Sequence, residues 1–297
     1  MSFYIHDSEM ETFLCKLIEK FAKEGRPSLH NNVALTWIVY QGNNPKSSSG
    51  IGVGFSADKL IYPASIVKLF YGCAIETWIS KNLLIDSQEL RRAMYEMIVN
   101  SSNDATSYIV DLLTATTSGP SLHSKRWEVW KKQRNVVNNW IHDLNGPEFK
   151  SINCCQKTWT DGPFGRDFDF YGVNNQNRNS LTTNATAKLL ELLMTGVLLK
   201  PKSSANIKNL LFRSLDLLKR KSDPDNQVDG FIGEGLPKGT QLWSKAGLMS
   251  EARHDASWFI TPEGQTMLLI IFSQGKDLAK DNYLLPAFAN ELVNWRR

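Results

Sequence analysis

Three short motifs follow one another along the chain and combine residue types that serve nucleophilic catalysis. They are Ser65-Ile66-Val67-Lys68, Ser101-Ser102-Asn103 and Lys245-Ala246-Gly247. A serine hydroxyl becomes a good nucleophile when a neighbouring base takes its proton, and a lysine amine held among apolar groups can be that base because its pKa is lowered. The combination predicts acyl transfer to a serine, with further groups that handle the proton and support the oxyanion.

The pattern Ser-x-x-Lys alone is a weak signal. It occurs three times, at Ser56/Lys59, Ser65/Lys68 and Ser273/Lys276. The second copy differs because an apolar segment poor in Gly and Pro follows it, which predicts a buried helix that begins at Ser65. On one helix face the Lys68 amine can reach the Ser65 hydroxyl, and the Ser65 N–H is free to donate to an oxyanion. The alternative is a helix N-cap serine followed by a lysine that reaches solvent.

The second motif is a polar cluster between two apolar helical runs. Its position predicts side chains that project into a cleft. Ser101 would pass a proton to a leaving group, and the Asn103 amide would hold a substrate carbonyl and contact Lys68. The alternative for the Ser-Ser-Asn string is a helix cap.

The third motif lies on a predicted strand that precedes a turn and a second strand. There Lys245 would point a fixed cation into the cleft. Gly247 would let substrate approach the backbone, and the Leu248 N–H would be the second oxyanion donor. Lys-Ala-Gly by itself predicts nothing.

The ordered set of motifs resembles the class A β-lactamases and their relatives, the penicillin-binding D,D-peptidases. The resemblance extends over most of the chain, from an N-terminal helix through a helical middle to the Lys-Ala-Gly hairpin and a C-terminal helix. It implies that Ser65 is the acylated nucleophile and Lys68 a base. It also implies that Ser101 is a proton relay and that Asn103 and Lys245 hold the substrate.

The chain departs from this family in the segment that releases the acyl group. The Glu-x-x-x-Asn of the lactamase omega loop, whose Glu activates the deacylating water, is not found. Counting back from Thr182 brings Asp167 or Asp169 to that place, and Asp167 is the first candidate for the base; a solvated pair of loop carboxylates is the alternative. Near the arginine that lactamases use for the substrate carboxylate the chain offers Arg253 and His254, the latter alternatively an edge-strand polar residue.

We expect an α/β (α+β) fold in which an antiparallel sheet is flanked by N- and C-terminal helices and joined to an all-helical lobe, as in β-lactamases and transpeptidases. Residues 1–297 would form one such domain, with an α/β lobe from residues 1–63 and 228–297 and a helical lobe from residues 64–227. Alternation predicts one strand, at Val33, Leu35, Trp37 and Val39.

Two helices in this scheme have their own signals. Ser8 and Glu11 predict a capping box at the start of an amphipathic N-terminal helix that ends at Gly25. Residues 124–134, extra material relative to the family, alternate basic residues with tryptophans. They predict an amphipathic helix, which we interpret as solvated and beside the cleft rather than as a membrane or phosphate site.

Composition excludes several classes of partner. The 297 residues are 42% hydrophobic, which suffices for a large core. The net charge is +4 and the basic residues are scattered, so no nucleic-acid partner is expected. No apolar run suits a membrane span, and no Cys or His spacing suits a metal, so we expect no membrane, no metal and no cofactor.

The N-terminal sequence and the cysteines predict a cytoplasmic location. Residues 1–7 lack the basic start and the apolar core of a secretory signal. Four cysteines, two of them adjacent at Cys154 and Cys155, fit a reducing compartment. Peptidoglycan and the antibiotics that mimic it act outside the cytoplasmic membrane, so this location separates the predicted chemistry from the family's usual substrates.

Our first functional hypothesis is a β-lactamase-like serine hydrolase. It would cleave an amide, lactam or ester of a small-molecule or peptide-like substrate through an acyl-enzyme on Ser65. One alternative is a cytosolic amidase similar to the serine-dependent glutaminases, which also use Ser-x-x-Lys. The other is a binding or sensing relative that acylates slowly or only binds. Because the omega-loop Glu is missing, we expect a penicillin adduct on Ser65 to be long-lived.

Overall fold

The molecule is built around one seven-stranded sheet. The computed structural model describes residues 3–42, 44–144 and 146–295, so both ends of the predicted 1–297 domain lie outside it. The strands are β1 (Ile5–His6), β2 (Val33–Tyr40), β3 (Ile51–Phe55), β4 (Phe212–Arg213), β5 (Gln241–Met249), β6 (Ala252–Ile260) and β7 (Thr266–Gln274). Their order in space is β1-β3-β2-β7-β6-β5-β4, and all neighbours are antiparallel except β1 and β3.

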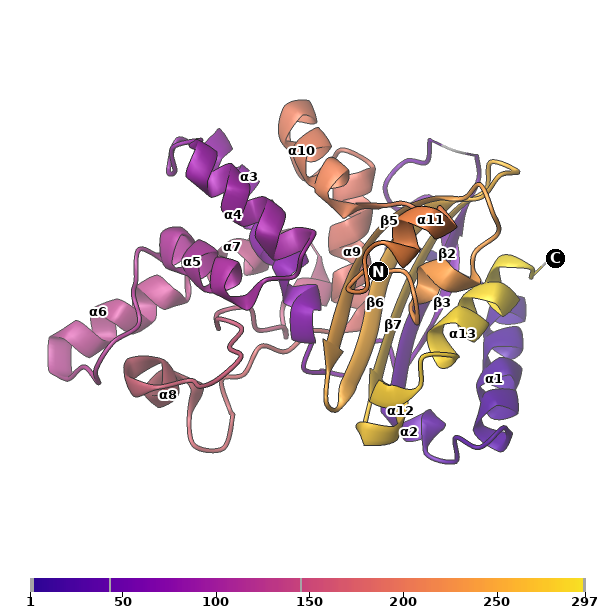
Figure 1. Cartoon of the computed structure of the whole chain (residues 1–297), viewed down its shortest axis with the longest axis horizontal. Coiled ribbons are helices and arrows are strands. Elements are labelled where there is room, and N and C mark those ends of the chain that lie inside the picture. Colours follow the sequence, from indigo (N-terminus) through magenta and orange to yellow (C-terminus); the bar gives the residue numbers. More distant parts are fainter. Residues whose placement is uncertain (1–2, 43, 145, 296–297) are drawn as a thin grey trace.

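Helices cover both faces of this sheet. They are α1 (Ser8–Lys23), α2 (Leu29–Asn32), α3 (Val67–Ser80), α4 (Gln88–Ile98), α5 (Asn103–Thr114), α6 (Ser124–Arg134), α7 (Val136–His142), α8 (Gly165–Tyr171), α9 (Thr183–Met194), α10 (Pro201–Leu211), α11 (Leu217–Lys221), α12 (Lys276–Lys280) and α13 (Leu284–Val293). Three short 3-10 helices are η1 (Ala64–Ile66), η2 (Pro147–Phe149) and η3 (Ile232–Gly235). Figure 1 shows α1 and α13 along one side of the sheet, with α3 to α10 on the other.

The two helical layers make two hydrophobic cores. One core packs α1 and α13 on the sheet and contains Trp37, whose ring meets that of Trp295 edge to face at 5.3 Å. The other packs α3, α4, α5 and α9 on the opposite face. Strand β7 is buried almost throughout because it lies under both layers, which explains its uninterrupted apolar sequence. The predicted fold class is confirmed.

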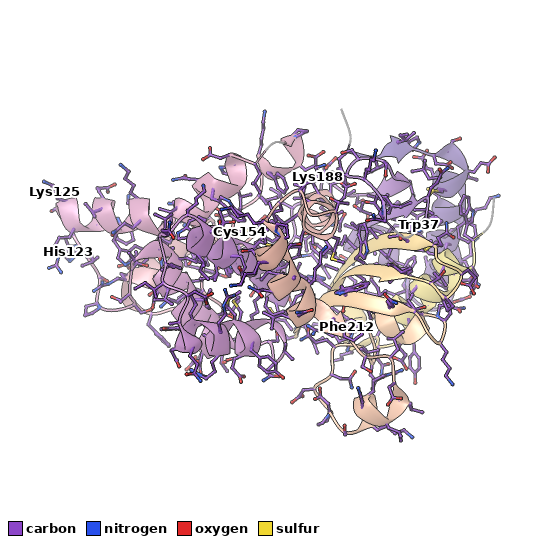
Figure 2. The ribbon with its side chains drawn as sticks, turned by 90° about the horizontal axis from the view of Figure 1, so that it is seen from above. Trp37, His123, Lys125, Cys154, Lys188 and Phe212 are labelled. Atoms are coloured by element: carbon purple, nitrogen blue, oxygen red, sulfur yellow. The ribbon has the colours of Figure 1, made fainter. Side chains whose placement is uncertain are left out.

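The helical part reaches far from the sheet. Figure 2 shows His123 and Lys125, at the start of α6, at the opposite end of the molecule from Trp37. Helix α6 has the predicted bounds, but its Trp130 and Arg134 side chains are buried, so the helix is not simply a solvated one. Strand β4 is a further difference, because it lies within the range 64–227 predicted as all-helical and pairs with β5.

The predicted capping box of α1 is wrong. The N-cap is Asp7, whose Oδ1 accepts hydrogen bonds from the N–H groups of Glu9 at 3.0 Å and Met10 at 2.9 Å. Ser8 is already the first helical residue, and Glu11 instead approaches the His6 ring at 3.2 Å. An aspartate caps as well as a serine and adds a negative charge at the positive end of the helix, which explains the earlier start.

Glycine at position 235 is required by close packing between η3 and α13. A Cβ there would lie 2.0 Å from the backbone oxygen of Pro286, which cannot move aside as a side chain can. We expect Gly235→Ala to lower the free energy of unfolding by about 1–3 kcal/mol, measured by urea denaturation. Gly72→Ala in α3 is the control, since its nearest neighbour is the flexible Ile207 Cδ1 at 3.3 Å. Equal stability of the two variants would contradict the packing argument.

Candidate active site

Ser65 lies in the short 3-10 helix η1, which runs directly into α3, so the α-helix that was predicted to begin at Ser65 is preceded by one tighter turn. Helix α3 begins two residues later, at Val67. The residue before Ser65 is strained, because Ala64 has φ of +47°, in the left-handed region that residues with a Cβ rarely adopt. Strained backbone of this kind concentrates at functional sites. Ser65 itself is only partly buried, so its hydroxyl stays accessible.

Strand β5 packs directly against this turn. A Cβ on Gly247 would lie 3.0 Å from the Pro63 carbonyl oxygen and 3.2 Å from the Ser65 nitrogen. Gly247 was predicted to let substrate approach the backbone, but the close approach that the structure shows is that of the Ser65 turn. The glycine therefore allows β5 to bring its backbone, including Leu248, next to Ser65.

Lys68 is the second residue of α3, three residues after Ser65, and its side chain is fully buried. Its Nζ donates hydrogen bonds to the Ser101 carbonyl oxygen, to Asn103 Oδ1 at 2.9 Å and to Ser101 Oγ at 3.3 Å. Burial lowers the pKa of Lys68 to about 7. A substantial fraction of this amine is therefore neutral near pH 7 and able to accept a proton.

Ser101 connects this lysine with the third motif. Its backbone is left-handed, with φ of +56°, and its Oγ accepts a hydrogen bond from Lys245 Nζ at 3.0 Å in addition to the one from Lys68. Lys245 is fully buried, and both this burial and the charge of Lys68 hold the pKa of Lys245 well below its ordinary value. With two amines donating to its oxygen, the Ser101 hydroxyl is free to direct its own proton elsewhere.

Gln227, which the sequence analysis missed, ties these motifs together. Its Oε1 accepts hydrogen bonds from Lys245 Nζ at 2.7 Å and from the Ala246 N–H at 3.0 Å. Its Nε2 donates to the carbonyl oxygens of Ile98 at 3.2 Å and Val99 at 2.7 Å. One buried amide thus joins the end of α4 to strand β5. Its loop sequence, rich in Asp, Asn and Pro, contains no signal for this role.

Two cavities meet at Ser65. The Arg178 cavity, of about 350 Å³, is lined among others by Ser65, Asn103, Trp159, Tyr171, Arg178 and Met249. The Arg253 cavity, of about 560 Å³, is lined among others by Ser65, Ser101, Asn103, Gln227, Glu234 and Arg253. Leu248 lines both. The Asn103 side chain lies between the two and also approaches Thr160 Oγ1, at 3.5 Å from its Nδ2.

Of the two residues predicted near the substrate carboxylate, only Arg253 reaches a cavity. Its guanidinium donates to the carbonyl oxygens of Ala279 at 3.0 Å and Gly230 at 3.1 Å and stacks on Phe231.

The prediction of a substrate-binding His254 needs correction. Its ring is fully buried, with Nε2 2.9 Å from the Tyr62 carbonyl oxygen and Nδ1 accepting from the Ser273 N–H, and burial lowers the pKa of His254 to about 4.

Asp167 is not brought to the cleft. Its Oδ1 accepts a hydrogen bond from Arg134 Nη2 at 3.1 Å, and both side chains are buried. Arg134 stacks on Trp130 and also lies 3.5 Å from Asp111, which pairs with Lys157. A buried carboxylate is stabilised by a paired cation, and here the last residue of α6, a helix that was predicted to be solvated, supplies it.

Among the described residues, no other carboxylate takes the place of Asp167 in the Arg178 cavity. Asp169 is exposed, and neither aspartate lines the Arg178 or the Arg253 cavity. The residues that line the Arg178 cavity include no carboxylate and no histidine. Asp161 stands between two of those residues, Thr160 and Gly162, but it is exposed and outside the lining.

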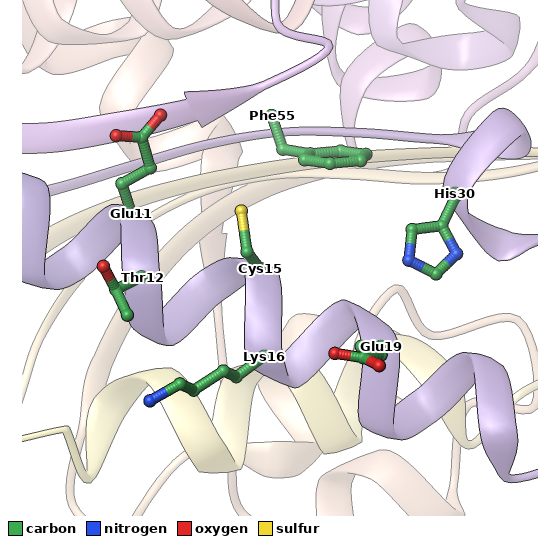
Figure 3. A pocket seen from close by; sticks show the side chains of 7 residues that line it. All are labelled: Glu11, Thr12, Cys15, Lys16, Glu19, His30 and Phe55. Atoms are coloured by element: carbon green, nitrogen blue, oxygen red, sulfur yellow. The ribbon is translucent and has the colours of Figure 1, made fainter.

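A separate groove lies over α1, away from Ser65. Figure 3 shows its side chains, among them Glu11, Cys15 and Lys16 on α1, with His30 and Phe55 opposite. The residues that line this groove are ordinary surface side chains. Among the described residues no cluster of His, Cys, Asp or Glu could hold a metal ion, and no helix is long and apolar enough to cross a membrane.

Comparisons with known proteins give a family and a fold. The model of the beta-lactamase enzyme family matches residues 80–295, a range that contains the second and third motifs but not Ser65. A beta-lactamase from Chitinophaga pinensis has a TM-score of 0.64 at 13% identity and covers 94% of this chain and 96% of its own. A variant of the last common ancestor of Gram-negative class A beta-lactamases has a TM-score of 0.65 at 14% identity and covers 95% of this chain and 98% of its own.

A mutant of the protein PBP-A, described as an acyl-enzyme complex with penicillin G, has a TM-score of 0.59 at 15% identity and covers 95% of each chain. At such identities the structural likeness shows the fold. No curated protein matches the chain.

The position of Asp167 predicts a structural and not a catalytic role. Asp167→Asn leaves the Arg134 guanidinium buried without its full charge partner, so we expect the free energy of unfolding to fall by about 3 kcal/mol. Asp169→Asn, two residues away and exposed, is the matched control and should leave it within about 0.5 kcal/mol of wild type. Chemical denaturation checks both variants. An Asp167→Asn protein as stable as wild type would show that the buried pair contributes nothing.

Proposed function

The chain belongs to the beta-lactamase enzyme family, and from that premise we propose that it is a serine hydrolase that forms an acyl-enzyme on Ser65. The observation that supports this most is the hydrogen-bonded cluster of Lys68, Ser101, Asn103 and Lys245 beside the Ser65 turn. The cluster contains a buried amine with a lowered pKa, a hydroxyl that two amines hold in place, and an amide at the meeting point of two cavities.

Acylation follows from these groups. Neutral Lys68 takes the Ser65 proton, and Ser65 Oγ attacks the carbonyl carbon of an amide, lactam or ester. The oxyanion accepts hydrogen bonds from the N–H groups of Ser65 and Leu248, which the approach of β5 brings together. As the bond to the leaving nitrogen or oxygen breaks, Ser101 donates its proton to that atom and takes in its place the proton that Lys68 received, so that both groups return to their starting states. The products are an ester on Ser65 and a neutral leaving group.

Release of the acyl group lacks a comparable base. Hydrolysis of the ester needs a water held by a group that takes its proton, and the Arg178 cavity offers none. Three carboxylates line the other cavity: Asp229 is paired with Arg220, Glu234 accepts from the Gly230 N–H, and Asp225 is exposed to solvent. The acyl-enzyme should therefore persist, so this protein resembles a penicillin-binding relative in its kinetics more than a fast lactamase. A glutaminase-like amidase, like any fast hydrolase of this family, would need the same water, so this observation favours slow turnover, as in a binding or sensing relative, over both.

Removal of the nucleophile tests the proposal. Ser65→Ala should abolish covalent labelling by a fluorescent penicillin, because the ester cannot form, while the thermal unfolding temperature should stay close to that of wild type. Ser56→Ala is the control, because Ser56 starts another copy of the Ser-x-x-Lys pattern. Gel fluorescence after a timed reaction measures the label. Labelling of Ser65→Ala at the wild-type level would show that the nucleophile lies elsewhere.

The buried Lys68 amine predicts how acylation depends on pH. Only the neutral amine accepts a proton, so the second-order rate constant of labelling should rise about tenfold per unit below pH 7 and level off above it. Lys68→Ala should lower the rate constant of labelling by a factor of roughly 10² and remove its rise with pH.

A second buried group complicates that profile and provides its control. Burial also raises the pKa of Asp255, near Lys245, to about 7. If Lys68 is the base, the labelling rate constant of Asp255→Asn should still rise with pH up to about pH 7. A wild-type rate constant that does not change with pH would contradict the assignment of Lys68 as the base. A rise with pH that is lost in Asp255→Asn alone would contradict it as well.

A further inference from the structure

The position of Ser101 indicates which part of the substrate lies on each side of Ser65. This inference rests on the proposed function, in which Ser101 gives its proton to the leaving group. Ser101 lines the Arg253 cavity but is not among the residues that line the Arg178 cavity. The leaving group therefore lies in the Arg253 cavity. The acyl part, which stays attached to Ser65, extends into the Arg178 cavity.

The Arg178 cavity contains a cation without a counterion. The Arg178 guanidinium stacks on the Tyr62 ring, 3.4 Å from its centroid. Within the described residues no carboxylate lies within ion-pair distance of it, and its Nε is buried without a hydrogen-bond partner. The one side-chain hydrogen bond that it makes among the described residues is a weak contact of Nη2 with Met249 Sδ at 3.8 Å.

The surroundings hold this guanidinium in place without neutralising it. The Arg178 carbonyl oxygen accepts a hydrogen bond from Asn153 Nδ2 at 3.0 Å, which fixes the backbone. Glu251 lines an adjoining cavity together with Arg178, but its carboxylate lies 3.9 Å from Lys276 Nζ and not against Arg178. By contrast Arg253, in the other cavity, has both its Nε and its Nη1 bound to carbonyl oxygens.

We propose that Arg178 determines specificity by binding a carboxylate on the acyl part of the substrate. An arginine fork suits a planar carboxylate, and a stacked guanidinium with unused donors loses little freedom when it forms those bonds. The aromatic side chains of Tyr62, Trp159 and Tyr171 supply the walls for an apolar body next to that carboxylate. The substrate class is an amide or ester whose acyl part carries an apolar group and a negative charge.

Two matched probes test this specificity. Both are penicillins with a phenylacetyl side chain, and one carries an additional carboxylate on the side-chain α-carbon. The second-order rate constant of adduct formation is measured for each by intact-protein mass spectrometry. We expect the wild type to react about 10- to 100-fold faster with the anionic probe, the range expected for a charged hydrogen bond. Arg178→Gln should lose that preference, so that the ratio of the two rate constants falls to about one.

Two further variants control for charge and geometry. Arg126→Gln removes the same charge from an exposed position on α6 and should keep the full preference. Arg178→Lys should keep part of it, because the charge remains and the fork is lost. Equal rates of the two probes with the wild type would overturn the inference alone. Absence of an adduct with either probe would overturn the proposed function and the inference with it.

Discussion

Two buried lysine amines, those of Lys68 and Lys245, donate hydrogen bonds to one serine hydroxyl, and much of the site depends on keeping them there. Neither amine has a carboxylate within ion-pair distance among the described residues, so burial lowers the pKa of each. Holding such groups in place requires a rigid frame. The left-handed backbone of Ser101, the amide of Gln227 and the contact of β5 with the Ser65 turn across Gly247 provide that frame.

The same frame explains which parts of the molecule the sequence could predict. Strands and amphipathic helices follow from local periodicity, and the catalytic motifs combine rare residue types at short spacing, so both were recognisable. The roles of Gln227 and Arg178 depend on contacts between residues far apart in the chain, for which no local pattern exists. His254 and Asp167 were assigned to the cleft by their sequence positions relative to the family's motifs. In the fold, His254 instead contacts a backbone carbonyl, and Asp167 pairs with a buried arginine.

In the proposed mechanism, two chemical steps that a hydrolase must combine are separated. The groups that we propose for acylation lie around Ser65, while Asp167, the carboxylate predicted for release, lies with Arg134 in the packing between α6 and α8. The extra segment that contains α6 thus uses Asp167 for stability. A cavity with a free arginine and aromatic walls remains on the acyl side of Ser65, suited to holding an acyl group and poorly suited to activating water.

The lifetime of the acyl-enzyme tests this separation most directly. Wild-type protein is mixed with a small excess of a penicillin, the free compound is removed, and intact mass is followed with time while a digest locates the modified peptide. Our account predicts one adduct per chain, on the peptide that contains Ser65, which persists far longer than it takes to form. Multiple turnovers of penicillin with no accumulated adduct would contradict it, as would an adduct on a different peptide.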